Sequence, residues 1–262
     1  MRATLSKSEE DDLRRAKQIL EHPGLAAKLS ALAGAPVERG MALLPARWQK
    51  GVRDATGKAL MKALDLAVKS LGGKARLSSS DNFHKMAVAT SGAIGGAFGI
   101  AALGVELPIS TGLILRSIAD IAASHGEDPR NIDTRLACLT VFALGSPKDS
   151  SDDDAESGYF AARTALASAV TEASRHLAQK TIAKGGAPPL VRLVTLIAAR
   201  FGVVVSQKTA AQLVPVIGAA GGALINTIFI GHYQEMARGH FIVRQLERIH
   251  GEEPVRVAYE RL

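Results

Sequence analysis

The chain has 262 residues, which is enough for one large domain or two small ones with a sizeable core. With 47% hydrophobic and 22% charged residues it is not generally disordered, and with 4% aromatic residues it is poor in the rings on which nucleic-acid bases stack. The formal net charge of +7 favours a negatively charged partner, such as anionic lipid or nucleic acid. The single cysteine, Cys138, excludes a disulfide framework and a Cys-based zinc site.

The first twelve residues contain no apolar stretch typical of a secretory signal, so we expect none. Ser8 followed by Asp11 predicts the start of an amphipathic helix. Its apolar stripe extends to residue 20, where His22, Pro23 and Gly24 end it.

Residues 47–71 predict a second amphipathic helix with a basic side. Between Arg47 and Arg76 the net charge is +6, so nearly all of the excess charge lies here. Two interpretations stay open: a helix that lies on an anionic membrane, or a core helix with a basic solvated side. The residues expected to form the membrane or anion surface are Arg47, Trp48, Lys50, Lys58, Lys62 and Lys69.

Two long uncharged runs, 86–105 and 209–234, are rich in glycine and alanine. Each is long enough to span a bilayer, but their low hydrophobicity favours a buried or reversibly inserted helical hairpin. Small residues let helices approach closely, and the glycines expected to do so are Gly92, Gly95, Gly96, Gly99, Gly218, Gly221 and Gly222. Glu106 and Pro108 are expected to interrupt the first run before a helix at about 109–124.

Between the two halves lies a segment rich in Ser, Asp and Glu at 146–158, which predicts a mobile acidic loop. Helices are expected to resume at about 159–184 and 191–208, with Val203, Val204 and Val205 inside a helix. The patterns therefore predict an all-α, single helical domain of about eight to ten helices, with the two glycine-rich apolar segments at its centre. Within it we distinguish N-terminal helices at 1–80 and a helical core at 81–262.

A repeated motif indicates either an internal duplication or simply two similar helix ends. His125-Gly-Glu-Asp-Pro129 recurs as His250-Gly-Glu-Glu-Pro254, 125 residues later.

Motifs for catalysis or metal binding are absent from the sequence. The glycine-rich run lacks the Gly-Lys-Ser/Thr ending of a phosphate loop, the seven histidines form no His-Glu-x-x-His motif, and no Gly-x-Ser-x-Gly elbow is present. Cys138 lies in an apolar helical stretch typical of an inert thiol. We therefore expect no catalytic residue, no cofactor and no bound metal.

One set of polar residues stands out, because it lies in or beside the apolar stretches. Its members are Glu106, Arg116, Asp120, Arg244 and Glu247. They form either independent surface pairs or a buried ion network that fixes how the halves dock and lines a pocket.

Two stretches resemble the bacterial EcsC family. The first runs from Glu106 to Ala122 and on to His125–Pro129; the second runs from Pro215 to Asn226 and on to Phe241–Glu247 and His250-Gly251. Phe142-Ala-Leu-Gly145 also fits, and the resemblance covers about residues 67–259. The family is named after a protein encoded beside the two components of an ABC transporter, and it supplies no catalytic residues. The resemblance implies a mostly helical intracellular protein associated with membranes.

Taken together, these features predict a non-catalytic accessory or regulatory protein in the cytoplasm, peripheral to or reversibly inserted into the inner membrane. Its expected partner is an anionic membrane surface or a membrane transporter, and nucleic acid is disfavoured. Two alternatives stay open. One is a small-ligand-binding or hydrolytic protein that uses Glu106, Arg116 and Asp120; the other is a soluble scaffold or effector without lipid contact.

Overall fold

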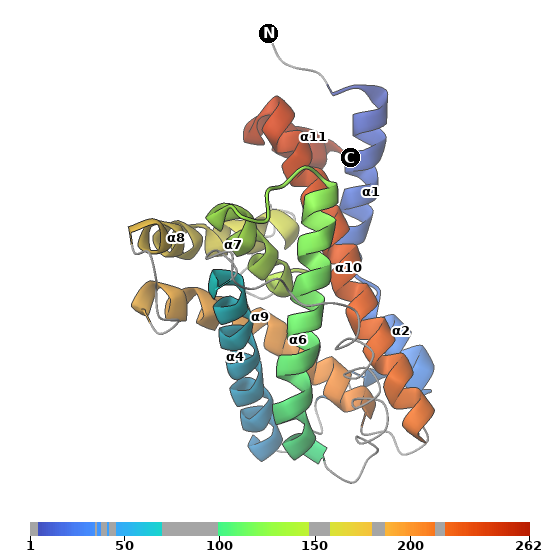
Figure 1. Ribbon diagram of the computed structural model, residues 1–262. Coiled ribbons are helices and arrows are strands. Elements are labelled where there is room, and N and C mark those ends of the chain that lie inside the picture. The colour runs from blue at the N-terminus through green and yellow to red at the C-terminus, as the bar shows by residue number, and fades with distance from the viewer. Residues whose placement is uncertain are drawn as a thin grey trace.

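The computed structural model describes residues 5–34, 36–37, 41, 46–69, 99–146, 158–179, 187–212 and 218–262. Within these residues every regular element is helical, as expected for an all-α domain (Figure 1). The elements are α1 (Lys7–Glu21), α2 (Leu25–Ala33), α4 (Ala46–Lys69), α6 (Gly99–Ser124), α7 (Ile132–Thr140), η2 (Val141–Ala143), α8 (Gly158–Gln179), α9 (Pro188–Gln212), α10 (Gly218–His250) and α11 (Glu252–Arg261).

Helix α10 is the central element, with 33 residues that run along most of the molecule (Figure 1). It packs against α1, α2, α6, α9 and α11. Its buried side includes Phe229, Tyr233 and Phe241, which are fully covered by neighbouring helices. The second glycine-rich run is therefore divided within the described residues: 209–212 end α9, and 218–234 form one continuous helix with the polar stretch that follows.

Helix α1 begins two residues earlier than the sequence pattern predicts. Ser6, and not Ser8, caps it: the Ser6 hydroxyl accepts from the Glu9 amide, and the Glu9 carboxylate accepts from the Ser6 amide. The helix ends at Glu21, immediately before His22-Pro23, as predicted. Leu13 and Ala16 on its apolar stripe are buried, and the helix packs against α10.

Helix α4 lies between α6 and α9 and packs against both. Its apolar stripe is buried, with Ala59, Leu60 and Leu64 among its covered residues. These side chains belong to the same hydrophobic core as those of α1, α8 and α10. The N-terminal helices and the later ones therefore share one core.

Helix α6 continues through Pro108, so the expected interruption at Glu106 and Pro108 is wrong. Proline removes one backbone N–H, which leaves the carbonyl four residues earlier without its usual helical partner. That carbonyl belongs to Gly104, an exposed residue where water can hydrate it. The helix therefore tolerates the proline without a break.

The two repeated His-Gly-Glu motifs both end a long helix. Gly126 follows α6 with φ +79°, and Gly251 follows α10 with φ +89°. Only glycine adopts such left-handed backbone angles without strain, which explains the glycine at both ends. The geometry accounts for the motif by helix termination, and an internal duplication stays a hypothesis.

Most of the first glycine-rich segment, including Gly92, Gly95 and Gly96, lies outside the described residues, as does most of the acidic loop (147–157). Gly99 and Gly218 begin α6 and α10, and Gly221 lies in the first turn of α10. Nothing described lies within 4 Å of a Cβ built on Gly222. That the two segments pack against each other at the centre therefore stays a prediction.

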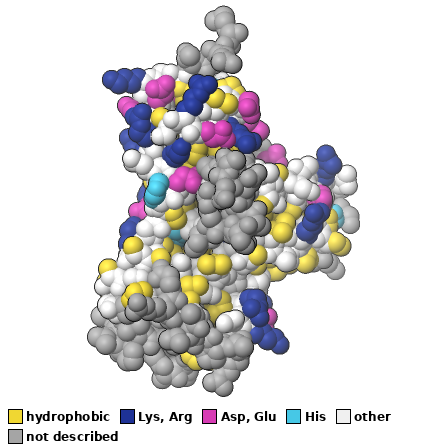
Figure 2. All heavy atoms as spheres, turned by 180° about the vertical axis from the view of Figure 1, so that it is seen from behind, with side chains coloured by type: hydrophobic (Ala, Val, Ile, Leu, Met, Phe, Trp, Pro, Cys, Tyr) yellow, Lys and Arg dark blue, Asp and Glu magenta, His cyan; other side chains and the backbone are white. Residues whose placement is uncertain are grey.

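Charged side chains of both signs gather at the end of the molecule that holds α1 and α11 (Figure 2). Helices α1 and α11, the first and last described helices, lie side by side there (Figure 1). Lys17 joins the two helices, because its Nζ donates to the Tyr259 carbonyl oxygen at 2.8 Å.

Candidate functional site

The polar side of α4 is an exposed basic surface. Four of its basic side chains are exposed and form no ion pair with any described carboxylate. We call these four residues, Lys50, Arg53, Lys58 and Lys62, the basic face. Trp48, at the start of the helix, is half-buried, and the side chains of Arg47 and Lys69 lie outside the described residues. Asp54 is exposed on the same side of the helix. The basic face is thus available to an anionic partner.

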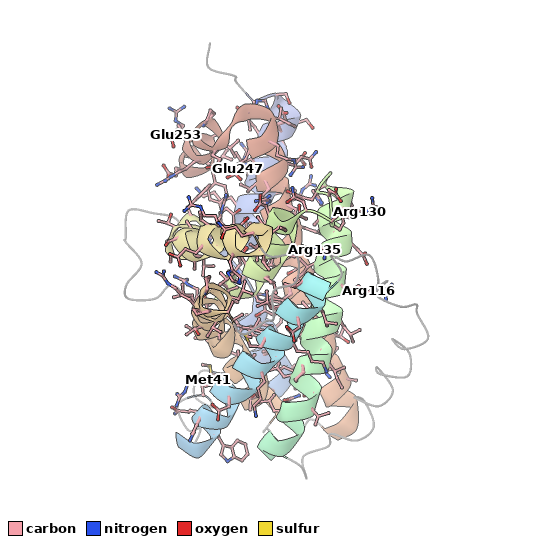
Figure 3. All side chains as sticks on the ribbon, turned by 60° about the vertical axis from the view of Figure 1, so that its left-hand side comes forward. Met41, Arg116, Arg130, Arg135, Glu247 and Glu253 are labelled. Atoms are coloured by element: carbon pink, nitrogen blue, oxygen red, sulfur yellow. The ribbon has the colours of Figure 1, made fainter. Side chains whose placement is uncertain are left out.

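An apolar groove of about 720 Å³ runs beside this surface, between α4 and α9. Val52 and Met61 of α4 and Val194 of α9 line it, and Arg53 of the basic face stands at its wall. Met41 also lines it and lies near the end of α4 in Figure 3. The groove therefore joins an apolar surface to a cationic one.

Helix α9 carries further exposed apolar side chains. Val191, Leu196 and Val203 keep 42%, 38% and 36% of their surface exposed. Within the described residues, Leu103–Ser124 and Pro188–Gln212 are the two helical stretches long and apolar enough to cross a membrane by length and composition. Among the described residues, the stretches that meet this criterion are thus most of α6 and all of α9.

The predicted polar set does not form one cluster. Glu106, in α6, pairs with Lys208 of α9, and both side chains are buried. Arg116 is half-buried beside Arg135 in a separate cavity of about 220 Å³. Asp120 is exposed.

Arg244 and Glu247, by contrast, meet in one cleft of about 610 Å³ between α8, α10 and α11. In Figure 3, Glu247 and Glu253 both lie at the end of the molecule that contains α11, well separated from Arg116 on α6. The structure therefore brings two of the five predicted residues together and places the other three elsewhere.

Each member of this pair has a partner that the sequence pattern did not indicate. Arg163 of α8 donates two hydrogen bonds to Glu247, from Nη1 to Oε1 at 2.6 Å and from Nη2 to Oε2 at 3.1 Å. Arg244 donates from Nε to Glu127 Oε1 at 2.8 Å. Glu127 also accepts from Arg248 and from the Thr134 hydroxyl.

Two groups in these ion pairs, Glu127 and Arg163, have shifted pKa values. Burial raises the pKa of Glu127, but the hydrogen bond and charge of Arg244, with Thr134 and Arg248, outweigh it and leave that pKa below its ordinary value. Burial lowers the pKa of Arg163, yet Tyr159 and Glu247 raise it above its ordinary value overall. Glu127 and Arg163 are therefore ionised at neutral pH.

A buried histidine completes the wall of the cleft. His240 is 2% exposed and lines the cleft. Its Nδ1 lies 2.9 Å from the Tyr159 hydroxyl, which accepts from Arg163 Nη1 at 3.2 Å. Burial, with the nearby charges of Arg163 and Arg244, holds the pKa of His240 well below its ordinary value, so the ring is neutral.

His240 Nδ1 and the Tyr159 hydroxyl form one hydrogen bond with each other. The other ring nitrogen, Nε2, is buried without a hydrogen-bond partner among the described residues. Sequence spacing gave no signal for this arrangement, because Tyr159, Arg163 and His240 lie on two helices some eighty residues apart.

The described residues contain no group of three or more His, Cys, Asp or Glu side chains that could hold a metal ion. Cys138 is buried, and burial raises the pKa of its thiol to about 12. A thiol of that pKa is a poor nucleophile at neutral pH.

Comparison with known proteins identifies the family. No curated protein and no solved structure shows significant similarity to the chain. The model of the EcsC protein family matches residues 8–246, which begins much earlier than the resemblance at 67–259 and includes α1 and α4. The match covers nearly the whole chain, and this protein belongs to the EcsC protein family.

Proposed function

We propose that this protein is a non-catalytic accessory or regulatory protein that binds the anionic cytoplasmic surface of a membrane. The observation that carries the proposal is the basic face of α4: four exposed cations without an acidic partner among the described residues. Each Lys or Arg near an anionic membrane surface contributes about 1 kcal/mol. Four of them give a substantial but reversible attraction.

The packing of α4 supports a surface-binding role for this face. The apolar side of the helix is fixed against α6 and α9, so its cations face outward in the folded protein without any rearrangement. The adjacent groove and the exposed Val191, Leu196 and Val203 of α9 offer apolar surface beside these cations. Amphipathic membrane-binding surfaces combine these two properties.

Vesicle flotation tests the proposal, with anionic phosphatidylglycerol-containing vesicles compared with neutral phosphatidylcholine ones. We expect binding to the anionic vesicles that weakens as salt is added, since salt screens exposed charges. Replacing Lys50, Arg53, Lys58 and Lys62 by Gln removes about 4 kcal/mol, or roughly a thousandfold in affinity. The matched control replaces four other exposed cations by Gln: Lys7, Arg130, Arg175 and Arg238.

Equal loss of binding in the two variants would refute a specific role for the basic face. Absence of binding to both vesicle types would refute lipid as the partner. If the protein still fractionates with cell membranes in that case, its partner is a membrane protein such as a transporter component.

A further inference from the structure

The cleft between α8, α10 and α11 has two chemically different layers. Its inner wall contains Arg163, Arg244 and His240. Its rim contains the exposed carboxylates of Asp133, Glu252 and Glu253, together with Arg256, which is paired with Glu260. Its volume of about 610 Å³ falls within the range of about 300–1,000 Å³ typical of small-molecule sites. No residue of the basic face of α4 lines it, so the cleft is a site separate from that face.

The inner wall presents hydrogen-bond donors. Glu247 is occupied by the two bonds from Arg163, and Glu127 is shared by Arg244, Arg248 and a hydroxyl. Arg244 uses Nε and Nη2 toward Glu127, which leaves its Nη1 without a partner among the described residues. The inner wall therefore has a spare donor at Arg244, and its carboxylate Glu247 is already bound by Arg163.

The spare donor of Arg244 has a fixed position, because Nε and Nη2 of the same guanidinium are bound to Glu127. Hydrogen bonds from arginine to a carboxylate are among the strong, charge-assisted ones. This wall is therefore suited to a carboxylate.

The rim presents the opposite chemistry. Glu252 and Glu253 are exposed in the first turn of α11 and form no ion pair with a described cation. Figure 3 shows Glu253 at the same end of the molecule as Glu247. An anion alone would have to pass these two carboxylates, whereas a ligand that also carries an ammonium group would be attracted by them.

We propose that this cleft binds a small zwitterion, an α-amino acid or a short peptide with free termini. Its carboxylate lies against Nη1 of Arg244, and its ammonium group lies toward Glu252 and Glu253. The apolar side chains of Phe160 and Leu166 in the same wall contact the aliphatic part of the ligand.

Thermal-shift and calorimetric titrations test the proposal, with the free L-amino acids and simple dipeptides as probes. Each probe is paired with its N-acetylated form and its C-terminal amide, which lack one of the two charges. We expect at least one zwitterion to raise the Tm and bind, and each blocked form of it to bind at least tenfold more weakly. No response to any zwitterion, or equal binding of the blocked forms, would overturn the proposal.

Two variants locate the site. Glu252→Gln with Glu253→Gln is expected to weaken binding about tenfold or more, and Arg244→Gln to abolish it, while Glu127 keeps Arg248 as its partner. The control is Glu10→Gln with Asp12→Asn, which removes two acids near the start of α1 that do not line the cleft. Should the rim variant bind as tightly as the control, the zwitterion is not held at this cleft.

Discussion

The ammonium group of Lys208 is hydrogen-bonded to the carboxylate of Glu106 in the interior, where the two side chains are 0% and 2% exposed. The pair joins α6 to α9, the two most apolar long helices of the described chain. The same Nζ lies 4.7 Å from the ring centroid of Phe229 in α10. Burial lowers the pKa of Lys208 although Glu106 opposes this. One contact thus connects three helices and cancels two charges that neither helix could bury alone.

Removing one member of this pair should destabilise the fold strongly. In Glu106→Gln the lysine loses its counter-charge in the interior, and breaking a buried pair in this way costs about 3–5 kcal/mol. Urea unfolding measures the loss. The matched control is Glu172→Gln, which breaks the exposed pair with Arg192 and should cost at most about 1 kcal/mol.

The double variant Glu106→Leu with Lys208→Met separates the pair's net contribution from the penalty of an orphaned charge. Apolar replacement of a buried ion pair is often neutral or stabilising, so we expect it to recover most of the stability that Glu106→Gln loses. A double variant as unstable as the single one would mean that the pair itself, and not the orphaned lysine, determines the loss.

Gly239 of α10 should be intolerant of any side chain. A Cβ built there lies 2.8 Å from Leu20 Cγ and 3.3 Å from the Ala16 carbonyl oxygen of α1, so alanine would force the two helices apart. We expect Gly239→Ala to lower the free energy of unfolding by about 1–3 kcal/mol. Gly231 lies in the same helix with nothing described within 4 Å of a Cβ, and Gly231→Ala should be neutral or stabilising by up to about 1 kcal/mol. Equal effects in thermal unfolding would contradict this close approach of α1 and α10.

The stability of the protein should fall in mild acid because of His232. Burial, with a smaller effect of Lys28, lowers the pKa of His232 from 6.5 to about 4. Between these values the unfolded chain takes up a proton that the folded chain does not, so stability falls as the pH drops below about 6.5.

At pH 5 this single histidine costs about 2 kcal/mol relative to neutral pH. His232→Gln removes the titration, so its free energy of unfolding should fall less than that of the wild type between pH 7.5 and pH 5. Parallel pH profiles from urea unfolding would show that His232 is protonated in the folded state. His250→Gln is a suitable comparison, since His250 is held by Glu9 at the surface end of α10.

Local patterns predicted the helices well where one side is apolar and the other polar. The basic helix at 47–71 is α4 at Ala46–Lys69, and Val203–Val205 lies inside α9 despite its β-branched residues. Boundaries were less secure, because a cap depends on a single hydrogen bond: Ser6 and Ser8 have the same side chain, and only Ser6 accepts from Glu9. The prediction at Pro108 was wrong because tolerance of a proline depends on whether the freed carbonyl is exposed.

The candidate sites were less predictable, since their residues come from distant parts of the chain. Arg244 and Glu247 were singled out as polar residues in an apolar context, and the two line one cleft. Their partners Glu127 and Arg163 could not be found from helical spacing. Lys208 was not predicted, although the sequence carries a usable signal for it: it is a lone charge in an apolar stretch, as Glu106 is.

The order of apolar, basic and glycine residues by itself determined that this chain is helical, that α4 has a cationic side, and which family it resembles. These properties depend on neighbours three or four residues apart, which the sequence contains. Tertiary structure alone decided which charges are cancelled and which are left without a partner. Glu106 and Lys208 are 102 residues apart, and only the tertiary packing of α6 and α9 brings them into contact while the lysines of α4 stay exposed. Electrostatic pairing depends on distance and burial, and both are properties of the fold.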